Sequence, residues 1–212
     1  MNKGTASKKE RLYECVWQLH LKGTDLGQIR MSEVAELSGI PKGTIYEHFR
    51  SKDQLIAESM VWFLEKEAKE LQRRITEAEN FDARMDVVLE WVASPSGRSL
   101  LMKDFADDGR LPEGLRREFL RCGQESGMCS VCLNGTEMVT KALEEAGKKE
   151  GIITEGSRLA RKTALYSALT PVVMYTMFPE RYEETCWEEV KVHAKRIFVA
   201  AFEKDKKNRP DF

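Results

Sequence analysis

Apolar residues recur at steps of three and four along most of the chain, and this spacing is typical of amphipathic helices. No segment shows the strict alternation of a half-buried strand, so the pattern predicts an all-α fold of about nine helices. The expected helices are 8–21, 31–38, a short one that begins at 41, a long one over 51–79, then 81–94, 100–107, 113–150 as one kinked helix or two pieces, 155–178 and 180–204.

The segment from Met31 to Phe49 has the pattern of a helix-turn-helix. Gly39 follows the first short helix and supplies the turn, because glycine adopts a left-handed backbone at little cost. Ile40 returns to the core, and Pro41 suits the first turn of the next helix, where its missing N–H is no loss. In such a unit the second helix enters the major groove of DNA.

The surface of this second helix carries suitable chemistry. Lys42 and Thr44 lie at its N-terminal end, where side chains meet base edges, and Gly43 lets the backbone approach DNA closely. Ile45 and Phe49 are four residues apart and can both point back into the domain. The remaining polar side chains are placed to reach phosphates, which fix the register without reading the sequence: Tyr46, His48 and Lys52.

Residues 30–64 resemble the DNA-binding signature of the tetracycline-repressor (TetR) family of one-component regulators. The similarity rests on the frame Lys42-Gly43-Thr44 in step with Tyr46, Phe49 and Lys52. At motif level it covers about a quarter of the chain, and the remainder agrees with the family in length and helical organisation only. The resemblance implies that the DNA-binding positions are Ser32, Lys42, Gly43, Thr44, Tyr46, His48 and Lys52, and Ile45 is included in the predicted set.

Composition supports two domains, a helix-turn-helix domain over 1–52 and a ligand-binding and dimerisation domain over 53–212, joined by the long helix that begins at Ser51. Residues 1–52 carry nine Lys and Arg against six Asp and Glu, whereas residues 53–212 carry 25 against 29. The basic end therefore coincides with the DNA-binding motif. Hydrophobic residues make up 42% of the chain and charged residues 33%, which favours a real core with long solvated helices over disorder.

The last two expected helices have apolar faces broader than a single packing contact requires. We expect these faces to pack against a second copy of the chain as a four-helix bundle, which makes the protein a homodimer. The predicted dimerisation residues are Leu159, Tyr166, Val173, Trp187, Val190 and Ile197.

The middle helices are rich in methionine, cysteine and aromatic side chains, which are suited to lining an apolar pocket. Plain core packing is the alternative for each of these residues. The predicted effector is a hydrophobic or aromatic small molecule. The predicted pocket residues are Phe63, Trp91, Met102, Phe105, Met128, Cys129, Cys132 and Met138.

Cys129 and Cys132 would share one face of a helix, with Cys122 seven residues earlier on the same side. Three thiolates would suit a redox switch or a soft metal, whereas buried cysteines also act as small hydrophobes in a pocket wall. No second such pair and no histidine with ligand spacing accompanies them, so neither a metal nor a cofactor is expected.

The sequence shows no nucleophile elbow, no phosphate-binding glycine loop and no His/Asp pair at catalytic spacing, so no enzyme is expected. The start of the chain lacks the apolar stretch of a signal peptide, and no run of about 20 apolar residues predicts a membrane helix. We therefore expect a cytoplasmic regulator that binds double-stranded operator DNA and is released by a small molecule. Two alternatives stay open: a redox or metal sensor that uses the cysteines, and an architectural or adaptor DNA-binding protein with a protein partner.

Overall fold

The computed structural model describes residues 7–97, 111–126, 128–154 and 156–202, and every regular element in these ranges is helical. The all-α prediction is confirmed. The expected helix at 100–107 lies outside the described residues. Within the described ranges no helix is long and apolar enough to cross a membrane.

The chain divides into two compact units, and the division falls inside two helices, α4 (Lys52–Glu77) and α8 (Met128–Lys149). Unit 1 comprises residues 1–68 and 99–132, and unit 2 comprises 69–98 and 133–212. This division differs from the boundary predicted after residue 52, because the first turns of α4 and a later helix, α7 (Glu113–Ser126), complete the core of unit 1.

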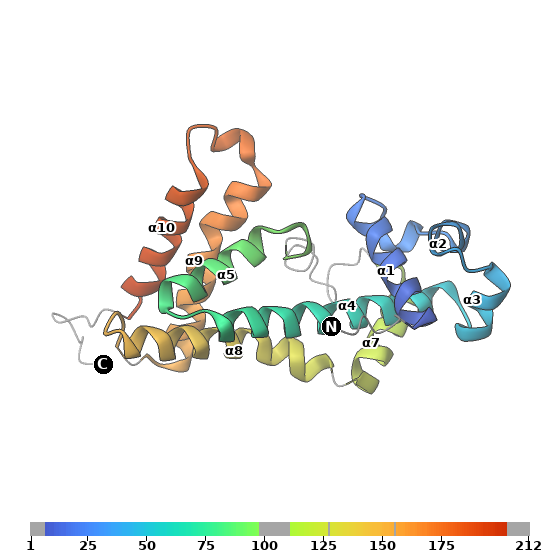
Figure 1. Cartoon of the computed structure of the whole chain (residues 1–212), viewed down its shortest axis with the longest axis horizontal. Coiled ribbons are helices and arrows are strands. Elements are labelled where there is room, and N and C mark those ends of the chain that lie inside the picture. The colour runs from blue at the N-terminus through green and yellow to red at the C-terminus, as the bar shows by residue number, and fades with distance from the viewer. Residues whose placement is uncertain (1–6, 98–110, 127, 155, 203–212) are drawn as a thin grey trace. The chain divides into compact units, whose positions relative to one another are not determined.

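Unit 1 contains α1 (Lys8–Leu21), a 3-10 turn η1 (Leu26–Gln28), α2 (Met31–Ser38) and α3 (Lys42–His48), together with the start of α4 and with α7 (Figure 1). Its core consists of apolar side chains that are fully shielded from solvent or nearly so. The side chains without exposed surface include Leu12, Val16, Val34, Ile45, Leu55, Ile56 and Leu115. Sequence-local capping fixes the ends of its helices: the Ser7 hydroxyl accepts from Glu10 N, and Gln54 N donates to the Ser51 hydroxyl.

Unit 2 contains the end of α4, α5 (Phe81–Ala93), most of α8, α9 (Arg158–Met177), the 3-10 turn η2 (Pro179–Arg181) and α10 (Trp187–Ala200). Helices α9 and α10 lie side by side and, with α5, enclose a core around Leu89, Leu143 and Phe198 (Figure 1). Close packing extends to α8, where a Cβ on Gly147 would lie 2.7 Å from the Ile153 side chain.

The segment 113–150 forms two helices, which is one of the two predicted alternatives, with α7 ending at Ser126 and α8 beginning at Met128. One predicted helix boundary is corrected. Helix α10 begins at Trp187 rather than at 180, because Pro179 starts a 3-10 turn instead. The Glu189 carboxylate then caps α10 by accepting from Cys186 N at 3.0 Å.

Candidate DNA-binding interface

The helix-turn-helix has the geometry that its sequence predicts. Helix α2 ends at Ser38, the next residue, Gly39, has a left-handed φ of 69°, and Ile40 is only 7% exposed as it enters the core. Pro41 precedes α3 with a φ of −58°, and its carbonyl accepts the first helical bond, from Ile45 N at 3.1 Å. The turn therefore delivers α3 to the surface with both of its ends defined.

Helix α3 presents a polar face to solvent. Lys42, Gly43 and His48 are exposed, Tyr46 is 51% exposed, and Thr44 is half-buried. Ser32, at the start of α2, is exposed as well. A Cβ added to Gly43 would meet no atom within 4 Å, so this glycine lies against open space. The arrangement can offer donors and a bare stretch of backbone to a DNA groove.

One member of the predicted DNA-binding set needs correction. Ile45 has no exposed surface and lies with Phe49, 1% exposed, in the core of unit 1. Its side chain therefore cannot contact DNA; instead it fastens α3 to the domain, as the four-residue spacing of Ile45 and Phe49 indicates.

Lys52 has a partner that the sequence does not reveal. Its Nζ donates to the carbonyl of Gly27 at 2.7 Å, and the side chain is half-buried. On the other side of α2, Arg11 Nη2 donates to the Ser38 carbonyl at 2.8 Å. Sequence reasoning missed Arg11 altogether, because its partner lies 27 residues away.

A second network of polar contacts joins α1 to α4. The Tyr13 hydroxyl donates to Glu58 Oε2 at 2.7 Å, and the Lys9 ammonium lies 3.3 Å from the same oxygen. Burial and the hydrogen bond to Glu58 raise the pKa of Tyr13 well above its ordinary value. Burial alone would raise the pKa of Glu58, but hydrogen bonds from Tyr13 and Gln54 and the Lys9 charge together lower it. Tyr13 also contacts Phe49 edge-on, with ring centroids 6.0 Å apart, so the network supports the end of α3.

The predicted effector residues are divided between the two units. Phe63 belongs to unit 1, where it is 6% exposed and stacks on Trp17 with ring centroids 3.6 Å apart. Trp91 and Met138 are partly buried against the core of unit 2. Met102 and Phe105 lie outside the described residues, as do the side chains of Met128, Cys129 and Cys132 on α8. The pocket that these residues would line stays a prediction.

The three cysteines lie on two helices, Cys122 on α7 and Cys129 and Cys132 on α8, so they do not form one face of a single continuous helix. Cys122 is buried in the core of unit 1, and burial raises the pKa of its thiol. It is therefore a thiol at neutral pH. Among the residues that the structure describes, no group of His, Cys, Asp or Glu side chains could hold a metal ion.

The predicted dimerisation residues fall into two groups. Leu159 is 75% exposed and Tyr166 is 57% exposed, both on α9. The others pack against the core of their own unit, Val190 fully and the rest partly: Val173, Trp187, Val190 and Ile197. Leu159 and Tyr166 therefore present most of their side-chain surface to solvent, whereas Val173, Trp187 and Ile197 present only part of theirs.

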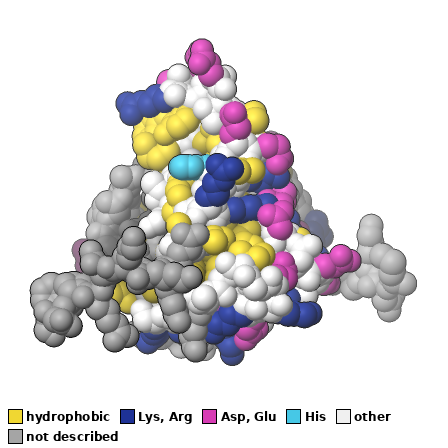
Figure 2. All heavy atoms as spheres, turned by 90° about the vertical axis from the view of Figure 1, so that its left-hand side faces the viewer, with side chains coloured by type: hydrophobic (Ala, Val, Ile, Leu, Met, Phe, Trp, Pro, Cys, Tyr) yellow, Lys and Arg dark blue, Asp and Glu magenta, His cyan; other side chains and the backbone are white. Residues whose placement is uncertain are grey.

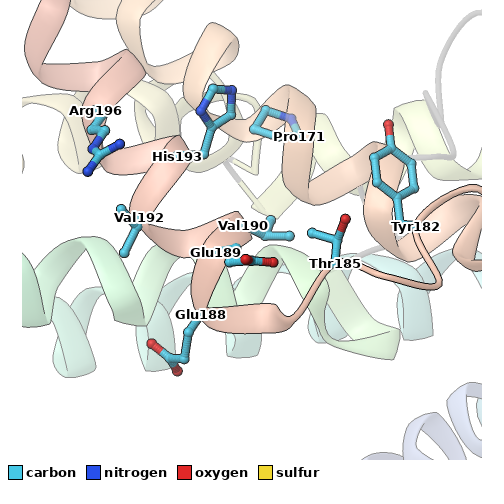
Figure 3. A pocket seen from close by; sticks show the side chains of 9 residues that line it. All are labelled: Pro171, Tyr182, Thr185, Glu188, Glu189, Val190, Val192, His193 and Arg196. Carbon is cyan, nitrogen blue, oxygen red and sulfur yellow. The ribbon is translucent and has the colours of Figure 1, made fainter.

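A groove of about 540 Å³ lies beside α9 and α10 (Figure 3). Pro171 of α9 lines one side, and His193 and Arg196 of α10 lie across from it. Figure 2 views the molecule from the left-hand side of Figure 1 and shows hydrophobic side chains around a histidine, with acidic and basic side chains beside them. The other lining residues are Tyr182, Thr185, Glu188, Glu189, Val190 and Val192.

Comparison with known proteins agrees with this geometry. Residues 25–59 match the family model described as bacterial regulatory proteins, tetR family. The chain shows no significant similarity to a curated protein sequence. The matched segment begins just before η1 and ends within α4, so it contains the whole helix-turn-helix.

Several solved structures share the fold over almost the whole chain. A tetR-family transcription regulator from Shewanella sp. PV-4 has a TM-score of 0.56 and 15% identity, with 92% of this chain and 98% of that chain covered. The fatty acid degradation regulator FadR from Bacillus halodurans also has a TM-score of 0.56 and 15% identity, with 97% and 100% covered. FadR from Bacillus subtilis, solved in complex with stearoyl-CoA, has a TM-score of 0.55 and 16% identity, with 91% and 97% covered. These proteins are transcription regulators, not enzymes.

Proposed function

We propose that this chain, a TetR-family DNA-binding regulator by its matched segment and its fold, is a homodimeric cytoplasmic repressor released from its operator by a small apolar or aromatic ligand. The observation that carries the DNA-binding role is the surface of α3. Lys42, Gly43, Tyr46 and His48 face solvent there, over a buried anchor at Ile45. A recognition helix needs this combination of exposed donors and a fixed back.

The dimer is supported by the exposed apolar side chains of unit 2. Leu159, Tyr166 and Met177 lie on α9, and Val192 lies on α10; their exposed fractions are 75%, 57%, 37% and 45%. Isolated exposed apolar residues are ordinary, but several on two adjacent helices beside a groove indicate an interface. A second copy is the occupant that a two-fold regulator of palindromic DNA requires, because paired heads must meet half-sites about 34–36 Å apart.

A charge placed in this surface tests the dimer. We expect light scattering to give the wild type twice the 24.3 kDa chain mass, and Leu159→Glu to give a folded monomer. Leu159 is preferable to Ile197, because Ile197 packs against the core of its own unit. Leu120→Glu is the matched control, since Leu120 is 47% exposed but lies on α7 in unit 1. A wild type that is monomeric at micromolar concentration would refute the dimer.

The effector is supported by the apolar composition of the middle helices and by the stearoyl-CoA bound to the Bacillus subtilis FadR. Such a ligand is held by buried apolar area, with few polar groups to orient it. Release follows if the ligand favours a setting of α4 in which the two heads no longer match the half-sites.

The test measures release of a fluorescein-labelled duplex that carries the site selected by the wild-type protein from random-sequence DNA. We expect stearoyl-CoA or another apolar ligand to lower the anisotropy, and coenzyme A alone to leave it unchanged. Cys129→Ser combined with Cys132→Ser should change the affinity for the ligand without abolishing release. If no effector releases this variant from DNA, and if an oxidant releases the wild type, the apolar-ligand proposal is wrong and the protein is a redox sensor.

A further inference from the structure

Two cationic side chains donate to backbone carbonyls on either side of α2, one at its last residue and one in the 3-10 turn η1 that precedes it. From α1, Arg11 Nη2 reaches the carbonyl of Ser38, the last residue of α2, at 2.8 Å. From the first turn of α4, Lys52 Nζ reaches the carbonyl of Gly27 at 2.7 Å, in the turn that leads into α2. The residues in each pair are 27 and 25 apart in the chain, so these are tertiary contacts.

The Arg11 contact fixes the C-terminal end of α2, from which the chain leads into α3. The last carbonyls of a helix have no partner within it, and a cation at that end also opposes the helix dipole favourably. Ser38 is 4% exposed, and its hydroxyl accepts from Ile40 N at 3.2 Å, so the same residue organises the turn. Arg11 thereby holds the point from which the chain passes through Gly39 into α3.

The Lys52 contact fixes the 3-10 turn η1 that precedes α2. Gly27 is closely surrounded, because a Cβ at this position would lie 2.8 Å from the Pro112 side chain, just before α7. Its carbonyl is therefore held in place, and Lys52 ties the start of α4 to it. The last residue of α2 is thus bound to α1, and the turn before α2 is bound to α4.

We propose that Arg11 and Lys52 are positioning residues for DNA recognition, and that their charges serve these carbonyls rather than DNA phosphates. By holding the last residue of α2 and the turn before this helix, they set the direction of α3, and with it the placement of Lys42 and Thr44 on the DNA. The sequence predicts a phosphate contact for Lys52, so the two roles are alternatives. The inference rests on the DNA-binding role and needs neither the effector nor the dimer.

Salt dependence separates the two roles. Each phosphate that a cation neutralises releases counterions and contributes about −0.9 to the slope of log K against log salt for duplex DNA. Loss of a phosphate contact therefore weakens binding and makes the slope shallower by about 0.9 for each protomer bound. Loss of a positioning contact weakens binding and leaves the slope unchanged, provided that the remaining phosphate contacts still form.

The experiment measures the affinity of Lys52→Gln, Arg11→Gln and Arg11→Lys for the selected fluorescein-labelled duplex over a range of salt concentrations. Circular dichroism fixes a temperature at which each variant is folded. We expect both glutamine variants to bind about tenfold more weakly with the wild-type slope, because each loses a charge-assisted hydrogen bond. Arg11→Lys keeps an N–H donor for the Ser38 carbonyl and should recover most of the affinity. Lys42→Gln is the control for a cation that lies on the DNA itself. Lys42 is exposed at the start of α3, and a positive charge brought into the groove there displaces counterions whether it meets a base edge or a phosphate, so its loss should make the slope shallower.

A shallower slope in Lys52→Gln would overturn the proposal for Lys52 by showing a phosphate contact. Glutamine variants that bind like the wild type and lose only thermal stability would overturn it for both residues. If Lys52→Gln does not fold, the Arg11 variants carry the same test without a change in α4. A wild type that binds no duplex at any salt concentration would instead refute the DNA-binding role itself.

Discussion

Replacing Gly43 by alanine separates what the fold needs at this position from what DNA binding needs. Gly43 is the second residue of α3, and it does not have a positive φ. A Cβ there would meet no protein atom within 4 Å. Nothing within the described chain therefore requires glycine at this position.

The expected effect on stability is a small gain. Alanine is preferred to glycine inside a helix by about 0.5–1 kcal/mol, because glycine loses more backbone freedom on folding. Gly43 is near the helix end, so we expect a gain of about 0.5 kcal/mol in the free energy of unfolding of the DNA-binding unit. Affinity for DNA should fall, because the added methyl group occupies the surface by which the backbone of α3 approaches the groove. A loss of about tenfold corresponds to 1.4 kcal/mol.

Urea denaturation and anisotropy titration of the selected duplex measure the two quantities on the same sample. Gly135→Ala is the matched control, because Gly135 also lies in a helix, α8, with no atom within 4 Å of its added Cβ. This control should gain similar stability and bind DNA like the wild type. If Gly43→Ala binds as tightly as the wild type, the close approach of backbone to DNA is wrong.

Three further predictions concern the hydrogen bond between Tyr13 and Glu58, the reactivity of two cysteines, and a closely packed glycine. Tyr13→Phe should lower the free energy of unfolding at pH 7 by about 1–2 kcal/mol, because Glu58 loses a hydrogen-bond donor. The folded-state pKa of Glu58 is lowered, so its contribution is present above the unfolded pKa and lost as the pH falls. In urea titrations the deficit of Tyr13→Phe should accordingly shrink below about pH 4, and a deficit that is constant with pH would contradict the pairing. Exposed Cys186 should react with a thiol reagent far faster than buried Cys122, whose pKa is raised. Mass spectrometry of the folded protein measures the two labelling rates, and equal rates would contradict the burial of Cys122. Gly147→Ala should cost about 1–3 kcal/mol in urea denaturation, because its Cβ would lie 2.7 Å from a core side chain; an unchanged midpoint would show that the core yields there.

Several local features of this protein follow from neighbouring residues in its sequence. The bounds of α1 and α2, the left-handed turn at Gly39 and the start of α3 after Pro41 all match the prediction. Each depends on residues within a few positions of one another: the spacing of apolar side chains, a cap or a glycine. The exposed polar face of α3 follows from the same information, since the positions that must be buried leave the others outside.

The sequence was a poorer guide wherever a helix has more than one apolar surface available to it. Leu115, Phe119 and Cys122 lie on α7 within a segment for which the sequence predicts only helix, and only the structure shows that their side chains close the core of the DNA-binding unit. Ile197 and Leu159 belong to equally regular patterns, yet Ile197 packs against its own unit and Leu159 is left exposed. Periodicity indicates that a face is buried, but not against which partner.

The hydrogen-bond partners of the long polar side chains are visible only in the folded chain. Lys52 has the sequence context of a phosphate contact, and only the folded chain places its ammonium on the Gly27 carbonyl. Arg11 and Tyr13 find partners 27 and 45 residues away. A flexible side chain with a terminal donor bonds whichever acceptor the packing of the helices brings within reach, and that acceptor is set by the core, since the burial of apolar faces fixes where the helices lie.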